Sequence, residues 1–296
     1  MSGLDMLVAL ESIRFPALNL FFTGITYLGA EEAYFLVFVV VYLCINRRLG
    51  FRLFLAFVVS AYAMAVCKEL WAIPRPFLAY PHLLHPLALS TAEGYSMPSG
   101  HALLSTVVWG YIALQLRSWR WRLIPIATIV LVSFSRLYLQ LHWPADIIVG
   151  LAVGVVLLGA YVKVTGWVDT GQLKLSSMEC VAVIVVTGAL MYIFGVDVQN
   201  GVPAAGALMG GGLGYLALRH LGTYKEEASL AGHLLKVIPS VALLLAGRYV
   251  LGRIIGATPP AQMLIYTSMA FTVTLIIPLI IQRLSRVRLQ QGETAQ

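Results

Sequence analysis

Three short polar stretches carry most of the chemically versatile side chains of this 296-residue chain. Residues 68–76 read KELWAIPRP, residues 98–101 read PSGH, and residues 135–146 read SRLYLQLHWPAD. Each stretch borders a long apolar run, so its cations, imidazoles and carboxylate stand at the ends of predicted helices. Side chains of these types can bind an anion, attack it or transfer a proton to it.

In the first stretch, Lys68 lies near the end of an apolar segment, where a charge is costly unless it finds a partner or water. Pro74 and Pro76 end the helix and leave Arg75 at its edge. Taken alone, the two cations are also typical of anchors that extend to the membrane interface.

In the second stretch, Ser99 can cap the helix that follows, and Gly100 lets the backbone approach a ligand closely. The free N–H groups and the dipole of a helix start attract anions. His101 then lies on the first turn beside the bound anion. The alternative for this stretch alone is an ordinary N-cap with an interfacial histidine.

The third stretch places Arg136 before His142 and Asp146. Pro144 suits the first turn of a helix, and the i, i+4 spacing brings His142 and Asp146 together if that helix starts near His142. A carboxylate on one imidazole nitrogen fixes the tautomer and frees the other nitrogen to attack. An interfacial pair that caps a helix remains the alternative.

Together, the three stretches predict a phosphate site, because clustered cations and a helix N-terminus bind phosphate. His142, oriented by Asp146, is the predicted nucleophile, and His101 is the predicted proton donor. The mechanism requires no metal and no other cofactor, and the sequence offers no carboxylate cluster to hold a metal. The combined set is Lys68, Arg75, Ser99, Gly100, His101, Arg136, His142 and Asp146.

The composition indicates that a membrane holds these residues. The chain is 59% hydrophobic and 11% charged, whereas soluble domains carry about 25% charged residues. Apolar runs of ~17 to 25 residues, enough to cross a bilayer, recur along it. The prediction is an all-α, polytopic membrane helical bundle that begins with a short amphipathic surface helix rather than a cleavable signal peptide. The three cysteines form no CxxC motif and are read as buried thiols.

Ten apolar segments are predicted as spans. They are residues 15–30, 33–46, 51–73, 100–116, 123–141, 146–165, 178–196, 201–218, 232–251 and 261–281. Basic residues gather in alternate connections, which the positive-inside rule assigns to the cytoplasm. These residues are Arg47, Arg48, Arg52, Arg117, Arg120, Arg122, Lys163, Lys174, Arg219, Lys225, Arg283, Arg286 and Arg288. The polar site then faces outward, and the net charge of +7 reports orientation rather than a nucleic-acid partner. Arg248 and Arg253 are the exceptions.

The chain resembles the type 2 phosphatidic acid phosphatase superfamily of membrane lipid phosphatases. The family motifs K-x6-R-P, P-S-G-H and S-R-x5-H-x3-D are all intact and in order. They fall on Lys68, Arg75 and Pro76, then on Pro98, Ser99, Gly100 and His101, then on Ser135, Arg136, His142 and Asp146. The resemblance covers about residues 1–165 and is strongest over 68–146.

The resemblance implies a role for each matched residue. His142 would form a phosphohistidine intermediate, with Asp146 orienting it. His101 would protonate the leaving oxygen and then activate water. Lys68, Arg75, Arg136, Ser99 and the Gly100 amide would hold the phosphoryl oxygens.

The resemblance also implies the organisation of the chain and its substrate class. Residues 1–165 would form a six-helix phosphatase core, and residues 166–296 an extension of about four transmembrane helices with no assigned role. The expected substrate is a lipid phosphate monoester or diphosphate, such as phosphatidic acid, phosphatidylglycerol phosphate or undecaprenyl diphosphate. The expected location is the plasma (bacterial inner) membrane, with the site facing the periplasm or outside and the bilayer as partner. A lipid phosphotransferase and a phosphate-binding lipid transporter or flippase remain alternatives.

A loop before the second motif carries four further candidates. His82 and His85 have a spacing that suits a metal, but no third ligand lies nearby, so a loop bordering the site is preferred. Glu93 and Tyr95 are candidate contacts for the lipid headgroup.

Overall fold

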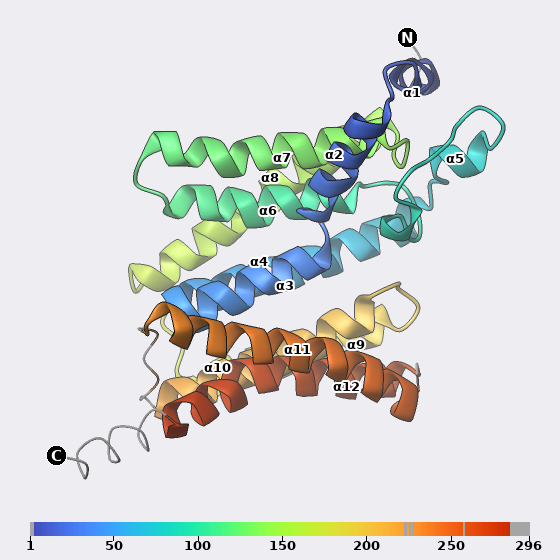
Figure 1. The fold of residues 1–296 in the computed structure, drawn as a ribbon. Coiled ribbons are helices and arrows are strands. Elements are labelled where there is room, and N and C mark those ends of the chain that lie inside the picture. Colours follow the sequence, from blue (N-terminus) through green and yellow to red (C-terminus); the bar gives the residue numbers. More distant parts are fainter. Residues whose placement is uncertain (1–2, 222–223, 225, 227, 257, 285–296) are drawn as a thin grey trace. The chain divides into compact units, whose positions relative to one another are not determined.

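The computed structural model describes residues 3–221, 224, 226, 228–256 and 258–284, and these are mostly helical (Figure 1). The helices are α1 (Gly3–Glu11), α2 (Pro16–Tyr27), α3 (Glu31–Val40), α4 (Arg47–Trp71), α5 (Pro76–Ala79), α6 (Gly100–Gln115), α7 (Trp119–Tyr138), α8 (Pro144–Asp169), α9 (Ser177–Gly195), α10 (Gly201–Leu221), α11 (Leu230–Ile255) and α12 (Pro259–Phe271). Two π-helical turns, η1 (Val41–Ile45) and η3 (Thr272–Ile276), extend α3 and α12, and η2 (Leu89–Thr91) is a 3-10 turn. The predicted all-α membrane fold is confirmed.

Seven described stretches are long and apolar enough to cross a membrane. They are Arg47–Ala79, Trp119–Tyr138, Pro144–Asp169, Ser177–Gly195, Gly201–Leu221, Leu230–Gly247 and Pro259–Leu284. The sequence predicted separate spans at residues 15–30 and 33–46. The structure instead has two half-length helices that meet at a 53° bend, and together they are long enough for one further span. The fourth predicted span, at residues 100–116, is the 16-residue helix α6.

The bend between α2 and α3 has a local cause. Leu28, Gly29 and Ala30 make turn-type hydrogen bonds to the carbonyls three residues earlier, so the helical ladder is interrupted there. A β-carbon at Gly29 would lie 2.5 Å from Val132 and 3.0 Å from the ring of His101. The break therefore lets the backbone pack directly against a predicted site residue.

The chain divides into two compact units. Residues 1–35 and 59–174 form the first, and residues 36–58 and 175–296 form the second. Every predicted site residue lies in the first unit. The first part of helix α4 belongs to the second unit and its last part to the first unit. The two units therefore do not follow one another along the sequence. The domain boundary near residue 165 stays a prediction.

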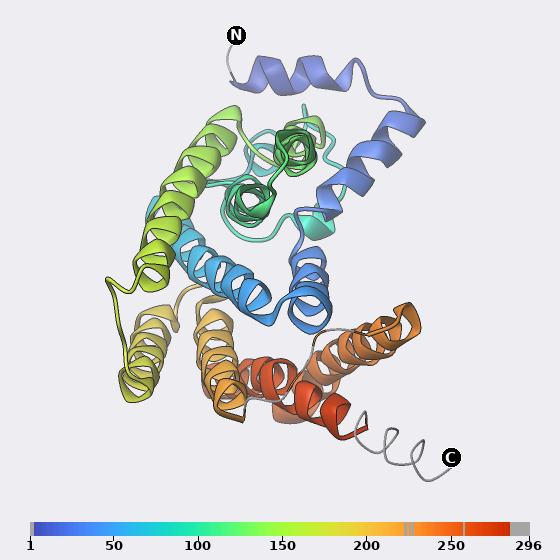
Figure 2. The same cartoon turned by 90° about the vertical axis from the view of Figure 1, so that its left-hand side faces the viewer.

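Within the first unit, α6 packs against both α7 and α8 (Figure 2 views the green α6 and α7 end-on, with α8 beside them). Two small residues of α8 allow this close approach. A β-carbon at Gly150 would lie 2.8 Å from the Ser99 carbonyl oxygen, and one at Gly154 would lie 2.9 Å from that of Leu103. The start of α6 is thus held against the start of α8, where the second and third motifs meet.

In the second unit, α10 packs against α9 and α12. The predicted close packing of this glycine-rich helix is confirmed, because a β-carbon at Gly210 would overlap the carbonyl of Thr267. The Tyr42 hydroxyl of η1 donates to the Thr274 carbonyl oxygen of η3 at 2.7 Å, so the two π-helical turns are joined.

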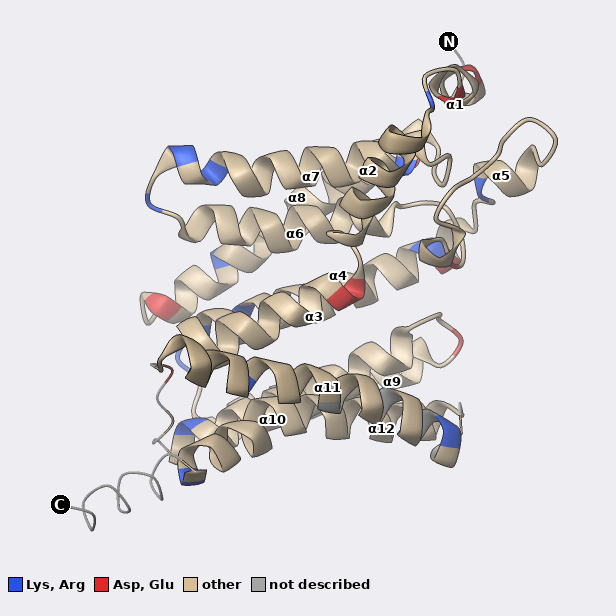
Figure 3. Ribbon diagram, in the orientation of Figure 1, with Lys and Arg blue, Asp and Glu red and all other residues tan. Residues whose placement is uncertain are grey.

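Basic residues lie at both ends of α7 (Figure 3). Arg120 and Arg122 are in the first turn of α7 and Arg136 is in its last, and a helix of this length spans about 30 Å. The predicted orientation toward the cytoplasm stays a prediction. Lys225, Arg286 and Arg288 lie outside the described residues.

Candidate active site

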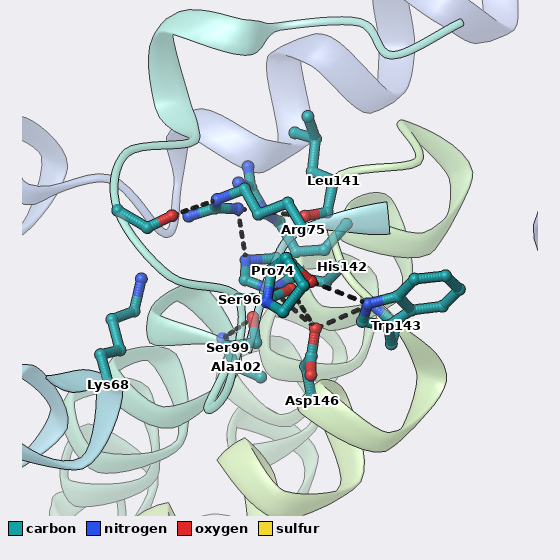
Figure 4. Close-up of polar contacts among 12 residues, drawn as sticks. Lys68, Pro74, Arg75, Ser96, Ser99, Ala102, Leu141, His142, Trp143 and Asp146 are labelled. Carbon is teal, nitrogen blue, oxygen red and sulfur yellow. Dashed lines mark hydrogen bonds and ion pairs between the residues drawn. The ribbon is translucent and has the colours of Figure 1, made fainter. Parts of the chain in front are cut away.

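Helix ends and the loops that join them hold the predicted site residues, of which Figure 4 labels Lys68, Arg75, Ser99, His142 and Asp146. Lys68 lies in the last turn of α4, Arg75 precedes α5, and Arg136 lies in the last turn of α7. His142 occupies the connection between α7 and α8, and Asp146 lies in the first turn of α8. Residues far apart in the sequence therefore converge at helix ends.

The predicted contact between His142 and Asp146 is confirmed. His142 Nδ1 lies 3.3 Å from Asp146 Oδ2, and the two side chains are 1% and 0% exposed. The helix begins at Pro144, two residues later than His142. Asp146 Oδ2 also accepts a hydrogen bond of 2.8 Å from the Trp143 N–H, which fixes the carboxylate at the helix start.

Arg75 determines which imidazole nitrogen of His142 carries the proton. The guanidinium Nη1 of Arg75 lies 3.2 Å from His142 Nε2. Arginine has donors only, so Nε2 must accept, and the ring proton belongs on Nδ1, facing the carboxylate of Asp146. The lone pair of Nε2 therefore points toward the guanidinium of Arg75.

The surroundings of His142 keep its ring neutral. Burial lowers the pKa of His142 well below its usual value, and the nearby charges of Arg75, Arg136, Lys68 and His101 lower it further. A ring with a lowered pKa stays unprotonated at neutral pH. Its Nε2 then carries no proton and can accept from Arg75.

Backbone carbonyls hold Arg75 in place. Arg75 is 2% exposed and donates to the carbonyl oxygens of Glu93, Gly94 and Leu141 at 2.6, 2.9 and 3.0 Å. Lys68 Nζ lies 3.4 Å from the same Glu93 oxygen. Sequence reasoning considered the side chain of Glu93, whereas the structure uses its main-chain carbonyl to gather two cations.

Arg136 is held in a similar way beside the other histidine. It is fully buried, and its Nη1 donates to the hydroxyls of Thr26 and Thr91 at 2.7 and 2.8 Å. The same Nη1 lies 3.4 Å from His101 Nε2, so each histidine faces one arginine. Sequence reasoning missed both threonines, because neither lies in a motif or at a recognisable spacing from Arg136.

The predicted cap at the start of α6 is present. Ser99 Oγ accepts from the Ala102 N–H at 3.5 Å, and the Ser99 N–H donates to the main-chain carbonyl oxygen of Asp146 at 3.0 Å. Gly100 is the first residue of the helix. The PSGH motif is thereby tied to the helix that carries the carboxylate.

Ser96 is a further buried contact of the pair that sequence reasoning missed. Its fully buried hydroxyl donates to Asp146 Oδ2 through a short hydrogen bond and lies 3.3 Å from His142 Nδ1. Its N–H donates to the Ile73 carbonyl oxygen at 2.8 Å, which joins the first two motifs. The only sequence signal for Ser96 as a site residue is that it lies two positions before Pro98 of the second motif.

Replacing Ser96 with alanine is expected to lower kcat about 10-fold and leave KM nearly unchanged. The change removes one hydrogen bond to a charged group, worth roughly 1.5 kcal/mol, without touching the arginines. Steady-state kinetics of the purified variant would measure kcat and KM separately. Ser133→Ala is the matched control, because that buried hydroxyl has no hydrogen-bond partner among the described residues. Equal kinetics for both variants would contradict the role of Ser96.

The two remaining loop histidines, His82 and His85, are exposed, whereas His142 is buried. His85 Nδ1 lies 2.7 Å from Glu11 Oε1 of α1, and its side chain is 72% exposed. Among the described residues, no three His, Cys, Asp or Glu side chains are grouped as metal ligands.

Two family models match the chain. The model of the PAP2 superfamily covers residues 49–169, and that of the PAP2 superfamily phosphatase, transmembrane extension, covers residues 202–291. The chain belongs to the PAP2 superfamily. The predicted family is thus confirmed, and all three motifs lie within the first match. This PAP2 protein crosses a membrane several times, as its helices indicate.

Individual relatives match only part of the chain. It is 38% identical over 113 residues to an undecaprenyl-diphosphatase of Sulfolobus acidocaldarius, covering 37% of this chain and 52% of that one. It is 24% identical over 181 residues to lipid phosphate phosphatase delta of Arabidopsis thaliana, covering 56% and 43%. The chain thus spans about half the length of the curated relatives it matches.

Among solved structures, a match is the transmembrane PAP2 type phosphatidylglycerolphosphate phosphatase from Bacillus subtilis. The two are 26% identical with a TM-score of 0.48, and the match covers 57% of this chain and 85% of the other.

Proposed function

We propose that the protein is an integral membrane phosphatase that hydrolyses a lipid phosphate monoester or diphosphate through a phosphohistidine intermediate. The observation that carries the proposal is the orientation of His142. Its Nδ1 faces Asp146 at 3.3 Å and its Nε2 faces Arg75 at 3.2 Å, so a buried, neutral nucleophile is directed at an anion site.

In the first step, His142 Nε2 attacks phosphorus and the bond from phosphorus to the leaving oxygen breaks. Asp146 stabilises the positive charge that develops on the ring. Lys68, Arg75 and Arg136 hold the phosphoryl oxygens as negative charge builds up in the transition state, with Ser99 and the Gly100 amide at the helix start. The result is a phosphohistidine and a leaving oxygen that needs a proton.

His101 supplies that proton. Its Nε2 lies 3.4 Å from Arg136 Nη1, a group that only donates, so donation from this nitrogen requires the imidazolium form. The negative charge of an arriving phosphate favours that form. In the second step, neutral His101 takes a proton from water, the hydroxide attacks phosphorus, the P–N bond breaks, and phosphate leaves.

Two observations support a lipid substrate. The site lies at the ends of membrane helices, where an acyl or isoprenoid tail can stay in the bilayer while its phosphate reaches the cations. The relatives also carry the names undecaprenyl-diphosphatase and lipid phosphate phosphatase. We place the site on the outer or periplasmic face, because the basic connections are at the other end of the predicted helices.

A substrate panel tests the proposal. Purified protein in detergent is given phosphatidic acid, phosphatidylglycerol phosphate and undecaprenyl diphosphate, and released phosphate is measured with and without a chelator. We expect release from at least one lipid with chelator present, because three side-chain cations supply the positive charge. A strict requirement for a divalent ion would contradict the metal-independent mechanism. Binding without release would favour a phosphate-binding transporter.

A further inference from the structure

The end of α7 has an unusual residue at its turning point. The Gln140 N–H donates to the Leu137 carbonyl oxygen at 2.9 Å, and the Leu141 N–H donates to that of Arg136 at 3.0 Å. This pair of bonds is the Schellman termination, whose left-handed position is usually glycine. Here Gln140 occupies that position with φ +59°, a left-handed conformation that is strained for a non-glycine residue.

The side chain of Gln140 explains why a strained glutamine fits here. It is fully buried, and its Nε2 donates to the Leu7 carbonyl oxygen at 3.0 Å and to Glu11 Oε2 at 3.1 Å. Its Oε1 accepts from the His85 N–H at 2.8 Å. The amide thus joins the turn to α1 and to the loop before the second motif.

Other contacts fix α1 at the same place. Arg14 Nε donates to the Tyr138 carbonyl oxygen at 3.1 Å, and its Nη1 donates to that of His85 at 2.7 Å. Leu7 is fully buried in an apolar cluster with residues of α6, α7 and α8. Helix α1 is therefore docked onto the segment that leads to His142.

The turn sets the positions of two site residues at once. His142 lies two residues after Gln140, and the intervening Leu141 offers its carbonyl oxygen to Arg75 at 3.0 Å. Arg75 in turn contacts His142 Nε2. A shift of the turn would move the nucleophile and the anchor of its phosphate-binding cation together.

We propose that Gln140 is a positioning residue that couples the docking of α1 to the orientation of His142. The inference rests on the proposed function, because its effect is on the rate of phosphate release. The side chain, rather than the left-handed backbone alone, carries the coupling.

Three variants separate the backbone from the side chain. Gln140→Gly keeps the left-handed turn without strain but deletes the amide contacts. Gln140→Glu keeps the shape but replaces the donor with a carboxylate that faces Glu11 and the Leu7 carbonyl oxygen. The double variant Gln140→Glu with Glu11→Gln restores a donor on the other side, since an amide at position 11 can donate to a carboxylate at position 140.

The measurements are kcat and KM for released phosphate, and hydrogen exchange of residues 3–11. We expect Gln140→Gly and Gln140→Glu to fold, to lower kcat about 10-fold or more with KM within about 3-fold, and to exchange faster in α1. The double variant should recover at least about 3-fold of the kcat lost in Gln140→Glu, while Glu11→Gln alone stays close to wild type.

Two results would overturn the inference. One is a wild-type kcat in folded Gln140→Gly and Gln140→Glu proteins, and the other is a double variant no faster than Gln140→Glu. Wild-type protein that releases no phosphate from any lipid of the panel would instead overturn the proposed function, so the two failures can be told apart.

Discussion

Replacing His142 with alanine is expected to reduce phosphate release at least about 1000-fold, because the variant lacks the atom that attacks phosphorus. The arginines and Lys68 remain, so binding of a phosphate analogue should persist. Phosphate release under saturating substrate measures the first effect. The variant should also form no phosphoenzyme. A brief incubation of the protein with radiolabelled substrate, quenched in base, measures whether the label becomes attached to the protein.

His220→Ala is the matched control for that experiment. His220 is an exposed residue of α10 in the second unit, so the same substitution there should leave release unchanged. Equal release by wild type and His142→Ala would remove the catalytic role of His142 and with it the proposed enzyme.

Replacing Asp146 with asparagine is expected to lower kcat roughly 100- to 1000-fold. Asp146 Oδ2 accepts from Trp143, Ser96 and His142, whereas Oδ1 has no hydrogen-bond partner among the described residues. An asparagine can keep its oxygen at the Oδ2 position and still accept these bonds. What it cannot supply is the negative charge that stabilises the ring as it binds phosphorus.

The kinetics of Asp146→Asn should therefore show a lower kcat with a smaller change in KM. Asp197→Asn is its control, since Asp197 is an exposed residue of the second unit that follows α9. A wild-type kcat for a folded Asp146→Asn protein would show that the carboxylate charge plays no part in turnover.

Much of the site could be predicted because its signals are local in the sequence. The contact of His142 with Asp146 follows from an i, i+4 spacing, and the cap at Ser99 follows from the residue types at a helix start. The clustering of the cations also followed, since short connections bring neighbouring helix ends together. These expectations need no knowledge of how distant segments pack.

The missed residues depend on packing between distant segments. Thr26 meets Arg136 across 110 positions, and Gln140 meets Leu7 across 133. No local pattern marks a threonine or a glutamine for such a contact. The bent segment formed by α2 and α3 was also missed. Two short apolar runs can each be predicted as a separate span, and only the angle between them shows that they are long enough together for one span.

The acceptors that hold Arg75 have a consequence for the end of the reaction. Carbonyl oxygens carry no net charge, so three of them orient the guanidinium without neutralising it. In the proposed reaction, Arg75 therefore keeps its attraction for anions after cleavage, when inorganic phosphate is the anion present. For the proposed reaction, we therefore expect inorganic phosphate to compete with the substrate, because both anions are attracted by the same positive charge.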